Sequence, residues 1–172
     1  MTMKLTPDTQ APALAVDLVG GGRFDLVSET PENFTMVVFY RGYHCPICKS
    51  YLGTLNGLID QCDTAGVSVV ALSMDGAERA AKTAEEWALS NLRLGYGLDE
   101  ATARSWGLYI SKAIRETEAD VFCEPGLFWI RPDGRLYLID ISNMPFARPD
   151  VAFLISKAAF VVEKGYPARG GD

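Results

Sequence analysis

Apolar residues form two short uninterrupted runs, at residues 36–40 and 67–72, with an amphipathic segment between them. Each run is typical of a buried strand in a parallel sheet. From residue 48 to residue 62, apolar side chains recur at helical spacing, which predicts one helix over 45–62. This order predicts two parallel strands joined by a right-handed crossover.

A further helix and strand are predicted after the second run. Asp75 followed by Glu78 has the pattern of a capping box, which predicts that a helix begins there. Its expected buried face consists of Ala80, Ala84, Trp87 and Ala88. Residues 92–96 are a candidate short strand, and Asp99 is suited to cap a brief helix that ends near Trp106.

Two segments of the chain, one near the N-terminus and one before the last predicted helix, carry the pattern of a β-hairpin. Residues 14–18 and 23–26 flank three consecutive glycines, and a strand follows these glycines, so a turn is predicted rather than a phosphate-binding loop. Residues 127–130 and 136–141 flank a Pro-Asp-Gly turn, which is a strong hairpin signal.

The remaining segments complete a single α/β domain over residues 1–172. The stretch 111–124 has no clear period and is predicted to be a loop. Pro149-Asp150 predicts the start of a last helix. The apolar face expected on that helix consists of Val151, Leu154, Ile155, Ala158 and Val162. The predicted architecture is a thioredoxin-like fold, a central mixed sheet flanked by helices, with an N-terminal β-hairpin extension.

Length and charge exclude several classes of protein. A chain of 172 residues can form one domain, and such a domain buries about 70% of the surface of its unfolded chain. Twenty-two acidic and 16 basic residues give a net charge of −6 with no basic run, which argues against a nucleic-acid binder. No stretch has the pattern of a signal peptide or a membrane span, so a cytoplasmic protein is expected.

Cys45 and Cys48 lie where the first predicted strand passes into the first helix. The unpaired amides and the positive end of the helix dipole favour a thiolate at this position, and the thiolate is the reactive form of cysteine. A structural zinc would need a second close pair, which Cys62 and Cys123 do not form. We therefore expect redox chemistry carried by the cysteines themselves, with no metal or organic cofactor.

The segment from Phe39 to Cys48, with the sequence Phe-Tyr-Arg-Gly-Tyr-His-Cys-Pro-Ile-Cys, resembles the peroxiredoxin-like branch of the alkyl hydroperoxide reductase / thiol-specific antioxidant family, within the thioredoxin-fold superfamily. Further support comes from residues 71–75, 126–134 and 165–170. The resemblance implies that Cys45 attacks a peroxide and becomes a sulfenic acid. Cys48, on the apolar helix face, then fits the role of the resolving thiol that closes a disulfide with it.

The chain departs from the family pattern around the nucleophile. Many relatives have a Thr three residues before the cysteine, a Pro seven residues before it and an Arg ahead of the hairpin. Here these positions hold Gly42, Val38 and Pro125. Arg41 is the expected replacement for the positive group. Pro125 instead matches the position of the cis-proline that faces the dithiol of thioredoxins.

His44, the single histidine, is expected to assist catalysis by lowering the pKa of the neighbouring thiol or by accepting its proton, although adjacent side chains need not point together. Tyr43, Pro46, Glu124 and Pro125 are the expected substrate-binding residues. For Glu124, a solvated loop acid is the simpler interpretation. Cys62 is expected to be inert core, whereas Cys123 either packs in a loop or serves as an alternative resolving thiol. The three tryptophans, Trp87, Trp106 and Trp129, are expected in the core.

Three functions remain open on these residues. The first is reduction of peroxides, with thioredoxin, glutaredoxin or glutathione as reductant. The second is thiol–disulfide exchange with protein or small disulfides, which the missing Thr and Arg favour. The third is a non-catalytic redox sensor or binding module. By analogy with the superfamily, a homodimer is expected.

Overall fold

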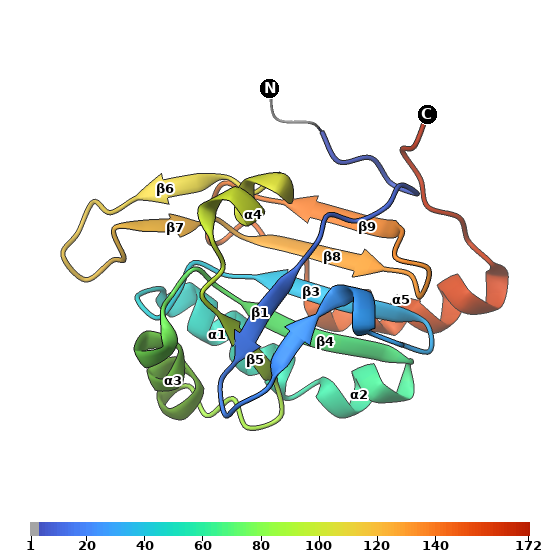
Figure 1. Cartoon of the computed structure of the whole chain (residues 1–172). Helices are drawn as coiled ribbons and strands as arrows, with labels where there is room; N and C mark the ends of the chain where they lie inside the picture. The colour runs from blue at the N-terminus through green and yellow to red at the C-terminus, as the bar shows by residue number, and fades with distance from the viewer. Residues whose placement is uncertain (1–3) are drawn as a thin grey trace.

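The computed structural model of the protein describes residues 4–172 (Figure 1). The prediction that the N-terminal segment is not a signal peptide involves residues 1–3, which lie outside this range. The centre is a seven-stranded mixed sheet with the strand order β2-β1-β5-β4-β3-β8-β9. Its strands are β1 (Ala15–Leu18), β2 (Arg23–Asp25), β3 (Phe34–Phe39), β4 (Val67–Leu72), β5 (Arg93–Tyr96), β8 (Gly126–Ile130) and β9 (Leu136–Ile141). The mixed sheet and the N-terminal hairpin confirm the predicted architecture.

Strands β3, β4 and β5 run parallel to one another, and the other pairs in the sheet are antiparallel. All six residues of β3 are buried, because helices or loops cover both faces of the sheet at its centre. Successive side chains point to opposite faces, so Met36 and Val38 lie in one core and Val37 and Phe39 in the other.

Helices cover the two faces unequally. The first core lies beneath α1 (Pro46–Asn56), α2 (Ile59–Thr64), α5 (Val151–Lys164) and the end of α3 (Ala77–Glu86). The second core lies beneath α4 (Glu100–Ser105), the 3₁₀ turn Leu26–Ser28 and a small hairpin of β6 (Ile110–Lys112) and β7 (Val121–Cys123). None of the described helices is long and apolar enough to span a bilayer. The three tryptophans are buried as expected.

The single helix expected over 45–62 is wrong, because the structure divides it into α1 and α2. Gly57 ends α1, and the Leu58 N–H donates to the carbonyl of Leu55, three residues back, which tightens the final turn. Glycine favours this break since it is a poor helix former. The apolar spacing nevertheless continues across the break, and Cys62 is buried on the same side as Leu55.

The capping box at the start of α3 is also wrong. Gly76 is the N-cap residue and contributes no side-chain bond. The Asp75 carboxylate instead accepts hydrogen bonds from the Tyr43 N–H and from Arg79. At the other end, Ala88 is exposed in a left-handed conformation after α3 has ended, so it is not on the buried face.

Residues 111–124, predicted to be a loop, contain most of the β6–β7 hairpin. These strands have three residues each and, in β6, partly exposed side chains, so they give little periodic signal. In α5, Asp150 caps the helix as expected by accepting the Phe153 N–H. Val162, expected on the apolar face of α5, is exposed.

Candidate active site

Cys45 is the N-cap residue of α1, and Pro46 occupies the first helical turn. The extended backbone of Cys45 turns its Sγ back over the helix, where it accepts the Cys48 N–H at 3.2 Å. Sulfur therefore takes the place that a Ser or Asp oxygen usually holds at a helix start. This thiol is not open to solvent, since Cys45 is only 1% exposed.

The two thiols of the motif differ in their readiness to ionise. Hydrogen bonds from the Cys48 thiol and N–H, aided by the charges of Arg148 and Arg41, outweigh burial and lower the pKa of Cys45 to about 6. Burial, together with donation to Cys45, raises the pKa of Cys48 far above its ordinary value. Cys45 is thus the thiolate at neutral pH, and Cys48 is the proton donor beside it.

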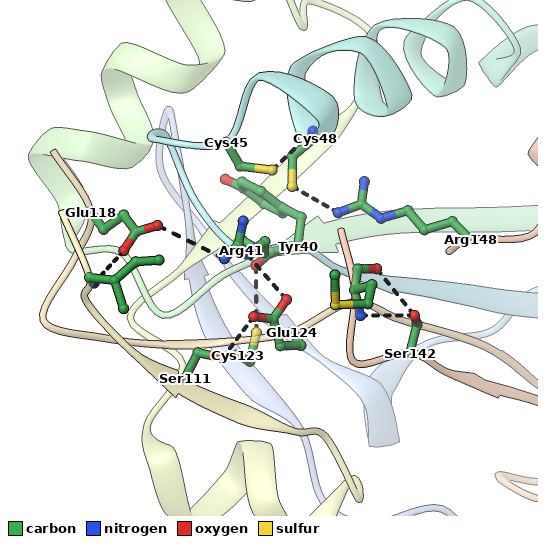
Figure 2. A network of polar contacts seen from close by, with 12 residues as sticks. Tyr40, Arg41, Cys45, Cys48, Ser111, Glu118, Cys123, Glu124, Ser142 and Arg148 are labelled. Carbon is green, nitrogen blue, oxygen red and sulfur yellow. Dashed lines mark hydrogen bonds and ion pairs between the residues drawn. The ribbon is translucent and has the colours of Figure 1, made fainter. Parts of the chain in front are cut away.

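Arg148 approaches the dithiol from the loop between β9 and α5 (Figure 2). Its Nη2 donates to the Sγ of Cys48 at 2.8 Å, and its guanidinium lies 5.0 Å from the ring centre of Tyr51. The Tyr51 hydroxyl donates to the carbonyl of Pro149 at 2.7 Å, which ties α1 to this loop. Arg148 is not predictable from a local sequence pattern, because it lies 100 residues from Cys48.

Arg41 lies on the other side of the dithiol and is held by carboxylates (Figure 2). Its Nε lies 3.1 Å from Glu124 and its Nη2 lies 4.0 Å from Glu118. Ser111 donates to the second oxygen of Glu124 at 2.7 Å. Glu124 is only 4% exposed, so its interpretation as a solvated loop acid is wrong. The β6–β7 hairpin, which supplies Ser111, is what buries it.

His44 contacts Arg79 and Phe122 rather than the thiols. Its Nδ1 lies 3.5 Å from Arg79, and its ring meets Phe122 edge-on at 4.6 Å. Burial lowers the pKa of His44, which favours the neutral ring. Within residues 4–172, no hydrogen bond joins His44 to Cys45, so its expected catalytic role stays a prediction without a direct contact.

Tyr43 anchors the loop that precedes Cys45. Its N–H donates to the buried Asp75 at 2.8 Å, its hydroxyl bonds Glu86, and its ring stacks on Trp87. Gly42 has a φ of +134°, and a side chain there would meet Asp75. A glycine is therefore required at the position where many relatives carry Thr.

Pro125 matches the position of the thioredoxin cis-proline, but its peptide bond is trans, as are all peptide bonds within residues 4–172. The Pro125 carbonyl accepts the Ser142 N–H at 3.0 Å. Pro125, Tyr51 and Arg148 line the same small cavity, next to the acid Asp140. Burial raises the pKa of Asp140.

Cys62 and Cys123 are both fully buried. Burial raises the pKa of Cys62 to about 11 and that of Cys123 to about 12. Cys123 lies on β7 rather than in a loop, and its thiol donates to the Tyr40 carbonyl at 3.5 Å. Both thiols are therefore protonated at neutral pH and have low reactivity.

A shallow groove of about 630 Å³ is lined by the two residues between the cysteines, Pro46 and Ile47, but by neither cysteine. It runs between the start of α1 and the loop before α5, and its lining includes Pro46, Ile47, Tyr51, Phe146 and Arg148. Of the expected substrate-binding residues, Pro46 lines this groove, whereas Tyr43 and Glu124 are engaged with other side chains. Within the described residues, no group of three or more His, Cys, Asp or Glu side chains is placed to hold a metal ion.

Comparison with solved structures identifies the fold. Peroxidoxin BcpB from Mycobacterium tuberculosis is 14% identical with a TM-score of 0.75, and the match covers 92% of this chain and 99% of that one. A cysteine-to-serine mutant of peroxiredoxin 6 from Arenicola marina is 15% identical with a TM-score of 0.79, over 95% and 76% of the two chains. Reduced Prx3 from Vibrio vulnificus, in complex with hydrogen peroxide, is 11% identical with a TM-score of 0.73, over 90% and 99%.

These similarities confirm the thioredoxin-like fold that the sequence predicts. No curated protein matches the chain. A family model, however, matches residues 7–139, a range that contains Cys45, Cys48, Arg41 and Glu124. On this match, the chain belongs to the AhpC/TSA family.

Proposed function

We propose that the protein reduces peroxides through Cys45 and resolves the product with Cys48. As a member of the AhpC/TSA family it is a peroxiredoxin-like, thiol-dependent oxidoreductase. One observation supports the finer assignment most strongly. The Cys45 sulfur caps α1, accepts the Cys48 N–H at 3.2 Å and has a pKa of about 6, while the Cys48 thiol lies beside it.

In the first step, the Cys45 thiolate attacks one oxygen of the peroxide and the O–O bond breaks. Cys45 becomes a sulfenic acid, and the other oxygen takes a proton and leaves as water or an alcohol. In the second step, the Cys48 sulfur attacks the Cys45 sulfur and a disulfide forms, while hydroxide leaves from Cys45 and takes up the proton that Cys48 releases to become water. Two thiols of an external reductant then return both cysteines to the reduced state.

The positive groups near the thiols support this function despite the missing Thr and Arg of the family pattern. The charge of Arg148 lowers the pKa of Cys45, and that of Arg41 does so to a lesser extent. Neither residue lies at the family position ahead of the hairpin, which Pro125 occupies. We propose that these two arginines together stabilise the Cys45 thiolate.

The reductant and the assembly stay proposals as well. Thioredoxin, glutaredoxin or glutathione would attack the Cys45–Cys48 disulfide, and a homodimer fits the family.

The apolar groove beside Pro46 and Ile47 favours a second candidate function, which is thiol–disulfide exchange with a protein or small disulfide. An extended segment of such a substrate can lie along this groove, beside the helix start that carries the dithiol. A redox sensor would use the same first step without turnover.

The test is the rate at which the fully reduced protein consumes hydrogen peroxide. We expect a rate far above that of a small dithiol with a similar pKa, complete loss of it in Cys45→Ser, and an accumulating sulfenic acid in Cys48→Ser. Cys62→Ser serves as a control, since Cys62 is buried away from the site. A rate no faster than that of the small dithiol would contradict the peroxidase assignment. Turnover with a disulfide substrate would then separate exchange from sensing.

A further inference from the structure

Arg148 has no carboxylate partner among the residues that the structure describes. Within residues 4–172 no acidic side chain forms an ion pair with it, whereas Arg41, Arg79, Arg93 and Arg131 each pair with an acid. Two of its guanidinium nitrogens, Nε and Nη1, are buried and lack a hydrogen-bond partner among the described residues. The third, Nη2, donates to Cys48 Sγ. The hydrogen-bond acceptor of this guanidinium is therefore a sulfur.

A partly buried cation without a counterion is costly, because it has lost hydration that nothing replaces. The group placed to supply the negative charge is Cys48, whose sulfur lies 2.8 Å from the guanidinium. As a thiol, Cys48 offers Arg148 no negative charge, and Asp140, which lines the same cavity, forms no ion pair with Arg148 within residues 4–172. As a thiolate, Cys48 would form a charge-assisted hydrogen bond with Arg148.

The reduced protein does not use this pairing, because its negative charge is on Cys45. The Cys48 thiol donates to that thiolate, and both this bond and the nearby charge oppose ionisation of Cys48. Oxidation of Cys45 to a sulfenic acid removes the negative charge from Cys45. The hydrogen bond to the Cys45 thiolate and its negative charge, which both oppose ionisation of Cys48, are then lost, while the contact between Arg148 and Cys48 remains.

We propose that Arg148 acts on the resolving half of the reaction, by holding Cys48 as a thiolate once Cys45 has been oxidised. The inference rests on the proposed function. The Cys48 thiolate attacks the sulfur of Cys45–SOH, the S–S bond forms, and hydroxide leaves and takes up the proton that Cys48 released. When a reductant thiolate later attacks Cys45, the S–S bond breaks and its electron pair returns to Cys48, which Arg148 again receives as a thiolate.

The test separates the two chemical steps in a single turnover. Reduced protein is mixed with one equivalent of hydrogen peroxide at pH 8, where Cys45 is ionised, and is quenched at intervals with a reagent that labels sulfenic acid. Intact mass then gives the fractions of reduced protein, sulfenic acid and disulfide. In Arg148→Met we expect the passage from sulfenic acid to disulfide to slow at least about tenfold, because a neighbouring cation lowers the pKa of an acid by about one unit or more. Arg148→Lys should restore much of the rate.

Arg131→Met is the matched control. Arg131 lies over Tyr137 at 5.0 Å, as Arg148 lies over Tyr51 at 5.0 Å, but it contacts no thiol. This variant should resolve the sulfenic acid at the wild-type rate. Thermal unfolding of each variant identifies any that fail to fold.

Two results would overturn the inference. One is wild-type resolution in Arg148→Met, which would limit any effect of Arg148 to Cys45, and the other is an equal slowing of both steps, which would indicate a general disturbance of the site. A wild-type protein that forms no sulfenic acid would instead refute the proposed peroxidase function. Reduction of the chemically oxidised protein by dithiothreitol tests the leaving-group role without any peroxide. We expect Arg148→Met to slow that reaction about tenfold as well, and an unchanged rate would contradict this role.

Discussion

Two arginines flank the dithiol, and they differ in what neutralises them (Figure 2). Arg41 is paired with Glu124 and Glu118, and Ser111 fixes the second oxygen of Glu124. Arg148 has no acid partner among residues 4–172 and donates to the Cys48 sulfur. Arg41 is ion-paired with acids before any chemistry begins, although its buried Nε has no hydrogen-bond partner among the described residues. Arg148 lacks such an acid partner within residues 4–172, and we assign it to the negative charge that the reaction creates.

The difference indicates separate tasks for the two sides. An arginine paired with two carboxylates exerts a weaker net field, so we expect Arg41 to stabilise the Cys45 thiolate less than Arg148 does. Arg41 also ties the loop before Cys45 to Glu124 and Glu118. An arginine without an acid partner exerts a stronger field on its neighbours, which for Arg148 include the Cys48 sulfur. The predictions below test this contrast.

The largest effect is expected from breaking the Arg41–Glu124 pair. Glu124→Ala leaves a partly buried cation and an unpaired Ser111 hydroxyl, and should lower the free energy of unfolding by about 3 kcal/mol. Urea unfolding measures it. The double variant Arg41→Met/Glu124→Ala should recover part of the loss, since it removes the stranded charge. Additive losses would show that the two side chains do not stabilise one another.

The pH dependence of peroxide reduction should distinguish the two arginines. Because the pKa of Cys45 is lowered to about 6, the reactive thiolate is present above pH 6 and is lost as the pH falls through that value. The second-order rate constant should therefore rise with pH and level off above about pH 7. In Arg148→Met the midpoint should lie about one pH unit higher, and in Arg41→Met it should move less. A larger shift in Arg41→Met would reverse the assignment.

Cys123 lies on the Arg41 side, and its thiol bonds the Tyr40 carbonyl. Cys123→Ala should leave peroxide turnover unchanged and lower the free energy of unfolding by about 1 kcal/mol, through lost packing and one weak hydrogen bond. Steady-state turnover and urea unfolding are the measurements. A slower passage from sulfenic acid to disulfide in this variant would make Cys123, rather than Cys48, a resolving thiol.

The smallest effect is expected for the stability of Arg148→Met. Removing a cation without an acid partner removes the free-energy cost of its desolvation. The methionine keeps part of the contact with Tyr51. We expect the free energy of unfolding to change by less than about 1 kcal/mol, in either direction. A loss as large as that of Glu124→Ala would show that Arg148 is mainly structural.

The strands and the dithiol could be predicted because their signals are local. An apolar run identified β3, a Pro-Asp-Gly turn identified the β8–β9 hairpin, and Cys45 and Cys48 follow β3 directly. Asp99 and Asp150 mark the starts of α4 and α5 by the same local logic.

The missed features depend on contacts distant in sequence. Asp75 looked like a helix cap, but a backbone N–H of the Cys45 loop, 32 residues away, engages its carboxylate. Glu124 looked exposed because the β6–β7 hairpin that covers it has almost no periodicity. Arg148 gave no signal, since only the folded sheet brings the loop before α5 to the dithiol. An arginine within a Pro-rich segment that precedes a helix does not by itself indicate contact with a distant thiol.

The most direct test of the account is the location of the bond that peroxide creates. Reduced protein is treated with one equivalent of hydrogen peroxide, its free thiols are alkylated, and its peptides are identified by mass. We expect a Cys45–Cys48 disulfide, with a loss of two hydrogens, and alkylated Cys62 and Cys123. A disulfide between Cys45 and Cys123, or a Cys45 oxidised beyond sulfenic acid beside an alkylated Cys48, would contradict it.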